Sequence, residues 1–279
     1  MNATGAWQVI WSARGGRAGA IVLALLLLVA ALGPPVLPNP RAMPDLGRVS
    51  LQPPGPGHWL GTDRDNRDVL SRVVNGARVS LAVAAGAVAL SVTLGTLVGM
   101  LAGYAGGWVD TLLMRLVDAA LAVPRLFLLL IMVAIMERIP LGVLILVLGA
   151  TGWFGTSRLV RAEVLRLRQL DFVHAAEALG ASRRRIAVAH LLPNVAGPLA
   201  AATTLAVGDV ILLEAGLSYL GLGVQPPMPS WGGMILEAQP YLITAPWTSL
   251  APGLAIVITV LAVNLVGEAL HQAFAPVRA

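Results

Sequence analysis

Six stretches of this sequence are apolar over about twenty residues each, and no other feature limits the possible folds as strongly. A helix of ~20 apolar residues crosses the ~30 Å hydrocarbon core of a bilayer. Because lipid offers the backbone no hydrogen-bond partners, such stretches cross it as helices. The sequence therefore predicts an all-α integral membrane protein with about six transmembrane helices. The predicted spans are residues 18–37, 79–103, 112–135, 139–157, 191–213 and 249–270.

The charged residues support this fold and exclude several activities. Only 12% of the residues are charged, against about 25% in a soluble domain. All nineteen basic residues are arginine, whereas a P-loop needs a lysine that reaches the nucleotide phosphates. The arginines flank the apolar runs, as membrane topology requires, and do not indicate nucleic-acid binding. The four histidines are scattered, so no metal site is predicted. Without paired catalytic groups, we expect a protein that is not an enzyme.

The first apolar run fits either an anchor helix or a cleaved signal peptide. Arg14 and Arg17 form a charged n-region, and residues 31–33 resemble a small-residue cleavage site. Two prolines follow that site directly, and the apolar run continues to Leu37. These features favour an uncleaved anchor.

The distribution of arginines predicts which side of the membrane each segment faces. With the N-terminus in the cytoplasm, the cytoplasmic segments hold eleven arginines and the exterior segments seven, as the positive-inside rule requires. Six spans return the C-terminus to the cytoplasm. The chain then divides into an anchor with an exterior loop (1–78), a core of five spans (79–270) and a cytoplasmic tail (271–279). The core includes a cytoplasmic loop at 158–190.

Two exterior segments have the composition of ordered structure. Thr62 and Asp63 are candidate N-caps, and the apolar residues that follow predict a short amphipathic helix over 62–78 at the membrane surface. Residues 214–248 are rich in glycine, proline and tryptophan. They predict an ordered irregular loop with short helical pieces.

Small and acidic residues within the spans mark candidate packing and pathway positions. Gly95, Gly99 and Gly103 form a small-residue ladder that lets another helix approach closely. Asp209 lies deep in the fifth span, where a carboxylate usually faces the bundle interior or an aqueous path. We expect it either to line a translocation pathway or to make a structural hydrogen bond. Glu214, which follows it, is a second pathway candidate that we place nearer the membrane interface.

The cytoplasmic loop at 158–190 contains a short helix followed by a basic patch. Asp171 is a candidate N-cap, residues 172–179 are good helix formers, and Gly180 is a natural helix stop. A basic loop near anionic lipid headgroups is one interpretation. The alternative, which the small alanine side chains favour, is a helix that docks closely on a partner protein. The candidate contact residues are His174, Ala175, Ala176, Glu177, Gly180, Arg183 and Arg184.

The order of residues in this loop resembles a known motif. Ala175-Ala176, Gly180 and Leu192-Pro193 are arranged as in the EAA loop of bacterial ABC-importer permeases. The similarity covers about residues 58–276, and three flanking stretches are similar to the dipeptide, oligopeptide and nickel branch. These stretches are residues 60–72, 103–110 and 218–232. Three residues depart from the pattern: His174 at a usual glutamate, His190 at a usual isoleucine and Asn66 at a usual glycine.

The resemblance implies the transmembrane domain of a type I importer in the bacterial inner membrane, the second, C-type permease of a pair. The chain would form half of a translocation pathway beside a second homologous permease. Two ATPase subunits, identical or different, would bind ATP and magnesium and hold the 171–185 segment. A periplasmic or lipid-anchored binding protein would deliver the solute. On this basis we expect di- or oligopeptides, with glutathione-like compounds, nickel chelates and opine-like metallophores as other solutes of the branch.

Two other functions are compatible with a chain of six spans. A self-sufficient secondary transporter or channel would work without partners, and Asp209 is the only deeply placed acid for a proton relay. The sequence shows no inverted repeat of the kind that builds many such transporters. An intramembrane enzyme lacks a nucleophile, base or metal set in this sequence.

Overall fold

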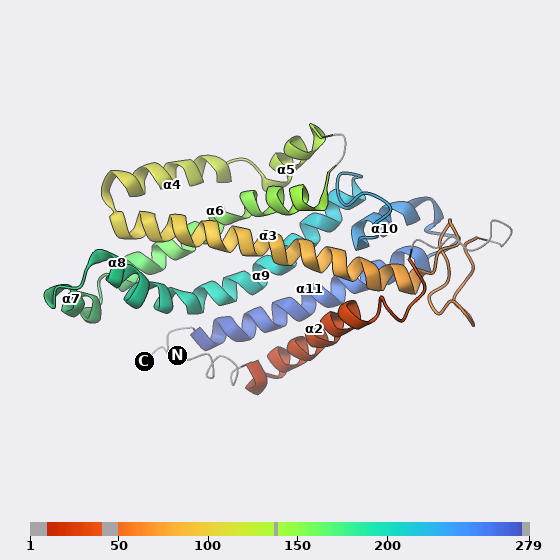
Figure 1. Cartoon of the computed structure of the whole chain (residues 1–279), viewed down its shortest axis with the longest axis horizontal. Coiled ribbons are helices and arrows are strands. Elements are labelled where there is room, and N and C mark those ends of the chain that lie inside the picture. The colour runs from red at the N-terminus through yellow and green to blue at the C-terminus, as the bar shows by residue number, and fades with distance from the viewer. Residues whose placement is uncertain (1–9, 41–49, 137–138, 275–279) are drawn as a thin grey trace.

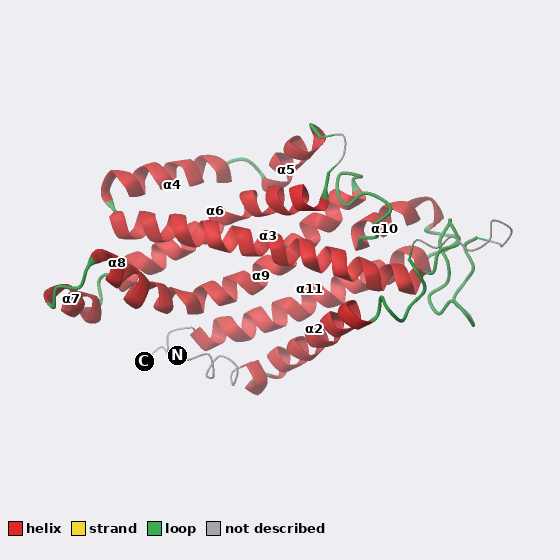
Figure 2. Cartoon of the chain, in the orientation of Figure 1, coloured by secondary structure: helices red, strands yellow, loops and turns green. Residues whose placement is uncertain are grey.

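The computed structural model describes residues 10–40, 50–136 and 139–274, and it is a long bundle of helices joined by loops (Figures 1 and 2). No strand occurs in these three ranges. The long helices are α2 (Arg14–Leu32), α3 (Val69–Ala105), α4 (Gly107–Leu121), α5 (Arg125–Ala134), α6 (Leu141–Leu167), α9 (Leu192–Tyr219) and α11 (Trp247–Phe274). The short ones are α7 (Asp171–Ala178), α8 (Arg183–Arg185), a π-helical turn (Ile186–Leu191), α10 (Trp231–Ala238) and a 3-10 turn (Gln239–Tyr241).

The helices run back and forth along the length of the bundle, and the short helices and the longest loops gather at its two ends. Helices α7 and α8 lie at one end, on the left of Figure 1, together with the start of α2 and the finish of α11. Helix α10 and the loop that precedes α3 lie at the other end. We call these the α7 end and the α10 end.

The number of membrane-crossing helices agrees with the sequence. Five helices are long and apolar enough to span a bilayer, and α4 with α5 makes a sixth that is bent by 79°. The break lies at Pro124, which has no backbone N–H to continue the helical ladder and precedes the first residue of α5. About six transmembrane helices in an all-α fold are therefore confirmed, and the third span, 112–135, is broken rather than merely kinked.

The helix expected over 62–78 does not exist as a separate element, so that prediction is wrong. Helix α3 begins at Val69 because Asp68 caps it, accepting a 2.7 Å hydrogen bond from the Ser71 N–H. Asp63, a predicted cap, instead accepts hydrogen bonds from the N–H groups of Asp65 and Arg67 within a turn. Residues 69–78 are the first turns of a single helix that continues to Ala105.

The glycine ladder of α3 lies against α6. A Cβ on Gly95 would come within 2.5 Å of Thr156, and one on Gly99 within 2.5 Å of the Ser157 carbonyl oxygen. A Cβ on Gly103 would come within 2.9 Å of Val164. The two helices therefore pack backbone to backbone along much of their length, which only small residues permit.

The first predicted span is a full member of the bundle. Helix α2 packs along α11, and a Cβ on Gly19 would come within 2.5 Å of the Ala262 carbonyl oxygen. Helix α11 continues to Phe274, so residues 271–274 of the expected tail are helical. The remainder of that tail, 275–279, lies outside the described residues.

Candidate functional site

Helix α7 is a single compact unit whose two ends are set by local sequence. Its N-cap is Leu170, one residue before the predicted cap, and Asp171 instead lies in the first turn, where its charge complements the helix dipole. At the other end Gly180 adopts φ +75°. Its N–H donates to the Glu177 carbonyl and the Ala181 N–H donates to the Ala176 carbonyl, at 2.9 and 3.0 Å. These bonds form a Schellman motif, which fixes where α7 stops.

One face of α7 is anchored to the bundle and the other is open. Val173 and Ala176 are buried in an apolar cluster that joins α7 to α6, the π-helical turn and α9. The other members of that cluster are Val160, Val164, Leu167, Ile186, Leu191 and Val195. The outward face exposes His174, Ala175 and Glu177, and Leu179 is 88% exposed. A short helix held on one side, with both polar and apolar side chains on its free side, is suited to contact a partner.

Two of the predicted contact residues, Arg183 and Arg184, lie outside α7, in the helix that follows it. Arg183 and Arg184 occupy the first turn of a helix that Ser182 caps and that runs without interruption to Tyr219. Their side chains line a groove against the end of α3, away from the outward face of α7. The loop predicted at 158–190 is also shorter than expected, because α6 continues to Leu167.

A largely apolar cavity that contains one charged group of each sign opens near the middle of the bundle. It has a volume of about 300 Å³ and is lined by α3, α5, α6 and α9, with Arg125 and Asp209 on its wall. Arg125 donates a 2.8 Å hydrogen bond to the Leu148 carbonyl, and Asp209 acts on it electrostatically. Asp209 is exposed and makes no hydrogen bond within the described residues. Arg125 is not among the predicted site residues, although an arginine inside an apolar run is itself a signal of function.

Glu214, the second predicted pathway candidate, does not line that cavity and is buried rather than interfacial. It is fully buried, and its carboxyl group accepts one hydrogen bond from Ser80 at 2.9 Å and one from Ser218 at 2.7 Å. Because both hydroxyl hydrogens are used in this way, the two serines accept from the N–H groups of Trp231 and Val224. Glu214 therefore joins α3, α9 and α10 as the common end point of this network.

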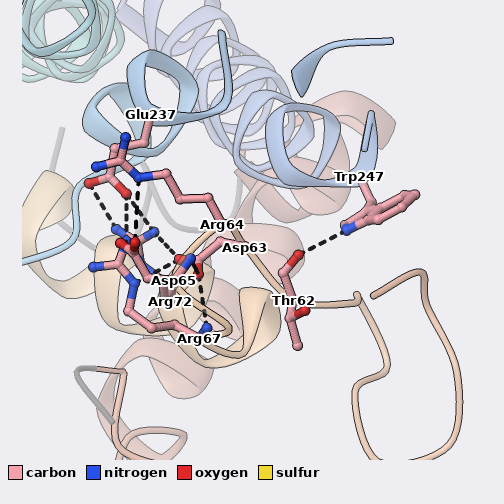
Figure 3. A network of polar contacts seen from close by, with 8 residues as sticks. All are labelled: Thr62, Asp63, Arg64, Asp65, Arg67, Arg72, Glu237 and Trp247. Atoms are coloured by element: carbon pink, nitrogen blue, oxygen red, sulfur yellow. Dashed lines mark hydrogen bonds and ion pairs between the residues drawn. The ribbon is translucent and has the colours of Figure 1, made fainter. Parts of the chain in front are cut away.

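The α10 end is held by a cluster of buried ion pairs (Figure 3). Arg72 of α3 donates to Asp63 at 2.6 Å and to Glu237 of α10 at 2.8 Å. Arg67 also contacts both carboxylates, each at 2.8 Å, and its guanidinium lies 2.7 Å from Asp65. The arginine side chains are 6% and 10% exposed, so water screens these pairs little. The cluster fixes the loop before α3 onto α10.

Comparison with known proteins identifies the chain. Residues 95–278 match the family described as the binding-protein-dependent transport system inner membrane component. The dipeptide transport system permease DppC of Alkalihalophilus pseudofirmus is 38% identical over 259 residues, which is 92% of this chain and 84% of that protein. DppC of Bacillus subtilis is 35% identical over 97% of this chain and 84% of its own. OppC of Haemophilus influenzae, an oligopeptide transport system permease, is 34% identical over 93% and 83%.

The matched region includes the loop and two of the three flanking stretches that suggested the resemblance. It begins within the glycine ladder of α3, contains α7 with its Schellman motif, and extends through α11. The resemblance drawn from Ala175, Ala176 and Gly180 is thereby confirmed, and a self-sufficient transporter is disfavoured. The chain belongs to the inner-membrane components of binding-protein-dependent transport systems, the permease subunits of ABC importers.

Proposed function

We propose that this permease forms half of the pathway by which di- or oligopeptides enter a bacterial cell across the inner membrane. A second homologous permease supplies the other half, and a periplasmic or lipid-anchored binding protein delivers the peptide. Two ATPase subunits bind ATP and magnesium in the cytoplasm. The names of the relatives, which are dipeptide and oligopeptide permeases, support peptides over the other solutes of the branch.

The observation that carries this proposal is the one-sided anchoring of α7. Val173 and Ala176 tie the helix to α6 and α9, while Leu179 and its neighbours leave the outward face open. A force applied to that face therefore acts on two membrane-crossing helices at once. Closing of the ATPases would shift the bundle between inward- and outward-facing states, with ATP as the ligand that biases a two-state element.

Engineered cysteines test the docking and the orientation together, because the chain has no native cysteine. In a Glu177→Cys variant the half-exposed position should react with an impermeant maleimide only from the cytoplasmic side. Binding of the ATPases should slow that reaction at least about tenfold, because an interface excludes water from its centre.

The matched control is Ile243→Cys, at a 96% exposed position at the α10 end. It should react only from the exterior and be indifferent to the ATPases. Labelling of Glu177→Cys from the exterior, or without protection by the ATPases, would contradict the proposed docking.

We further propose that the cavity with Arg125 and Asp209 belongs to the translocation pathway. A peptide carries an ammonium group at one end and a carboxylate at the other, and the wall of the cavity carries one group of each sign. In an environment with little water, each such contact is a charge-assisted hydrogen bond. Ser91 and Thr156 add uncharged polar groups to the same wall.

Replacement of Asp209 by asparagine should lower the uptake of peptides with a free N-terminus by about tenfold or more, because a hydrogen bond to a charged group is worth ~1.5–3 kcal/mol. Uptake of N-acetylated peptides should change little. Transport of both peptide classes in proteoliposomes measures the difference, with Asp118→Asn at an exposed pair with Arg158 as the control. An equal loss for both classes would show that Asp209 does not recognise the ammonium group.

A further inference from the structure

An apolar groove with a basic rim lies at the α7 end, apart from the outward face of α7. It has a volume of about 550 Å³ and runs between the last turns of α3 and the first turns of the helix that starts at Arg183. Its lining is Leu97, Met100, Leu101, Tyr104, Ala105, Arg183, Arg184 and Ala187. Most of the lining is apolar, and Arg183 and Arg184 are its two charged residues.

The α3 wall of this groove is held in place by groups outside it. Arg168 donates to the carbonyl oxygens of Gly103 and Tyr104 at 3.0 and 3.1 Å. Its guanidinium also lies 5.4 Å from the centre of the Tyr104 ring, a cation–π distance. Gly103 packs on Val164 of α6. The groove is therefore preformed and does not depend on a ligand for its shape.

The two arginines on the rim differ from three arginines of α6 at the same end, each of which pairs with a carboxylate. Arg158 pairs with Asp118, Arg161 with Asp110, and Arg166 with Glu163. Arg183 and Arg184 are exposed, and neither has a carboxylate within 4 Å in the described parts of the chain. They also lie in the first turn of their helix, where the helix dipole disfavours positive charge. Nothing in the helix itself compensates their charge, so an anion at the rim would do so.

We propose that this groove binds one anionic phospholipid, with an acyl chain along Leu97 and Leu101 and the phosphate on Arg183 and Arg184. Charge complementarity selects the headgroup, since basic residues next to membrane-crossing helices attract anionic lipids of the cytoplasmic leaflet. The apolar wall selects a ligand that also carries hydrocarbon, which free phosphate lacks. The proposal uses the proposed placement of the α7 end at the cytoplasmic face.

A lipid in this position would connect the end of α3 with the helix that begins at Arg183. Its headgroup would lie on the helix that continues into α9, and its chain on the end of α3. The loop that carries α7 returns to the bundle at Ser182, directly before the rim. Occupancy of the groove would thus stiffen the attachment of α7 without covering its outward face.

Photolabelling of the full chain in phosphatidylcholine nanodiscs tests this site without any need for transport. The probes are trace diazirine-acyl phosphatidylglycerol and the matching phosphatidylcholine, and mass spectrometry locates the adducts. We expect the anionic probe to label residues 97–105 and 183–187 many times more than the zwitterionic probe. The double variant Arg183→Gln/Arg184→Gln should weaken binding of the anionic probe by about thirtyfold, from the usual effect of two interfacial arginines.

The control is Arg14→Gln/Arg17→Gln, which removes two exposed arginines from the same end and should leave the labelling unchanged. Equal labelling by both probes, or an equal loss in the control, would overturn the proposal. The labelling should also persist after the ATPases are bound. Its disappearance would show that the groove belongs to the protein interface instead, whereas failure of the docking test at Glu177 would leave the nanodisc result standing.

Discussion

A Gly180→Val variant should insert and assemble normally yet lose peptide uptake by about tenfold or more, while ATP hydrolysis continues. Gly180 has φ +75°, a conformation that costs other residues ~1–2 kcal/mol and that β-branched residues avoid most strongly. A Cβ there would meet no atom within 4 Å, so the cost is conformational and not steric. The Schellman motif would open, and α7 would lose the orientation that lets its free face be held. Peptide uptake and ATP hydrolysis measured on the same proteoliposomes give the number of peptides transported per ATP hydrolysed.

Gly107 supplies a matched control for that experiment. It also has positive φ, at +56°, and a Cβ added to it would likewise have no atom within 4 Å, but it is the first residue of α4. Gly107→Val imposes a similar strain at the same end and should keep uptake coupled to hydrolysis. Normal uptake in Gly180→Val would refute the docking role, and equal losses in both variants would indicate general damage.

Replacing Arg72 by methionine should destabilise the protein by about 3–5 kcal/mol, the usual effect of removing one partner from a buried ion pair. Arg72 is bonded to Asp63 and Glu237, and its loss leaves two buried carboxylates to share Arg67. Thermal unfolding in detergent, compared at one scan rate, should show a large fall in Tm.

Two further variants separate this effect from loss of a surface charge. Replacing Arg64, whose side chain is 52% exposed, by methionine should lower the free energy of unfolding by only ~0–1 kcal/mol. The double variant Arg72→Met/Glu237→Leu should lose less free energy of unfolding than the two single variants together. The reason is that the carboxylate that Arg72→Met leaves unpaired is removed as well. An Arg72→Met variant no less stable than Arg64→Met would rule out the ion cluster as a stabilising element.

Structural features that depend only on residues close together in the sequence can be predicted well from it. The apolar runs specify the spans because length and composition alone decide whether a helix can cross lipid. The sequence predicts that α7 ends at Gly180 because only glycine readily adopts the left-handed conformation that ends a helix. The helix expected over 62–78 failed for a different reason. Arg67, which binds Asp63, also donates to Glu237, about 170 positions further along the chain, and no local pattern records that contact.

The two acids of α9 show the same limit at the candidate site. Asp209 and Glu214 are five residues apart, which separates them by roughly 140° around a helix with 3.6 residues per turn. They therefore face different surroundings, but the sequence does not say which side of an apolar helix is the cavity and which is the core. Arg183 and Arg184 likewise follow α7 closely in sequence and point into a groove on α3.

Helix α3 is a single rod of 37 residues, which at 1.5 Å per residue is about 55 Å long. It exceeds the hydrocarbon core by roughly 25 Å, so both of its ends stand clear of the lipid tails. Near one end Arg72 donates to Glu237 of α10, and at the other end, the α7 end, Arg168 donates to the Gly103 carbonyl. A tilt of about 10° around the middle of such a rod moves each tip by about 5 Å in opposite directions. The helix can therefore act as a lever, turning a push on one side of the bilayer into an opposite movement on the other side with no chain of intermediate rearrangements.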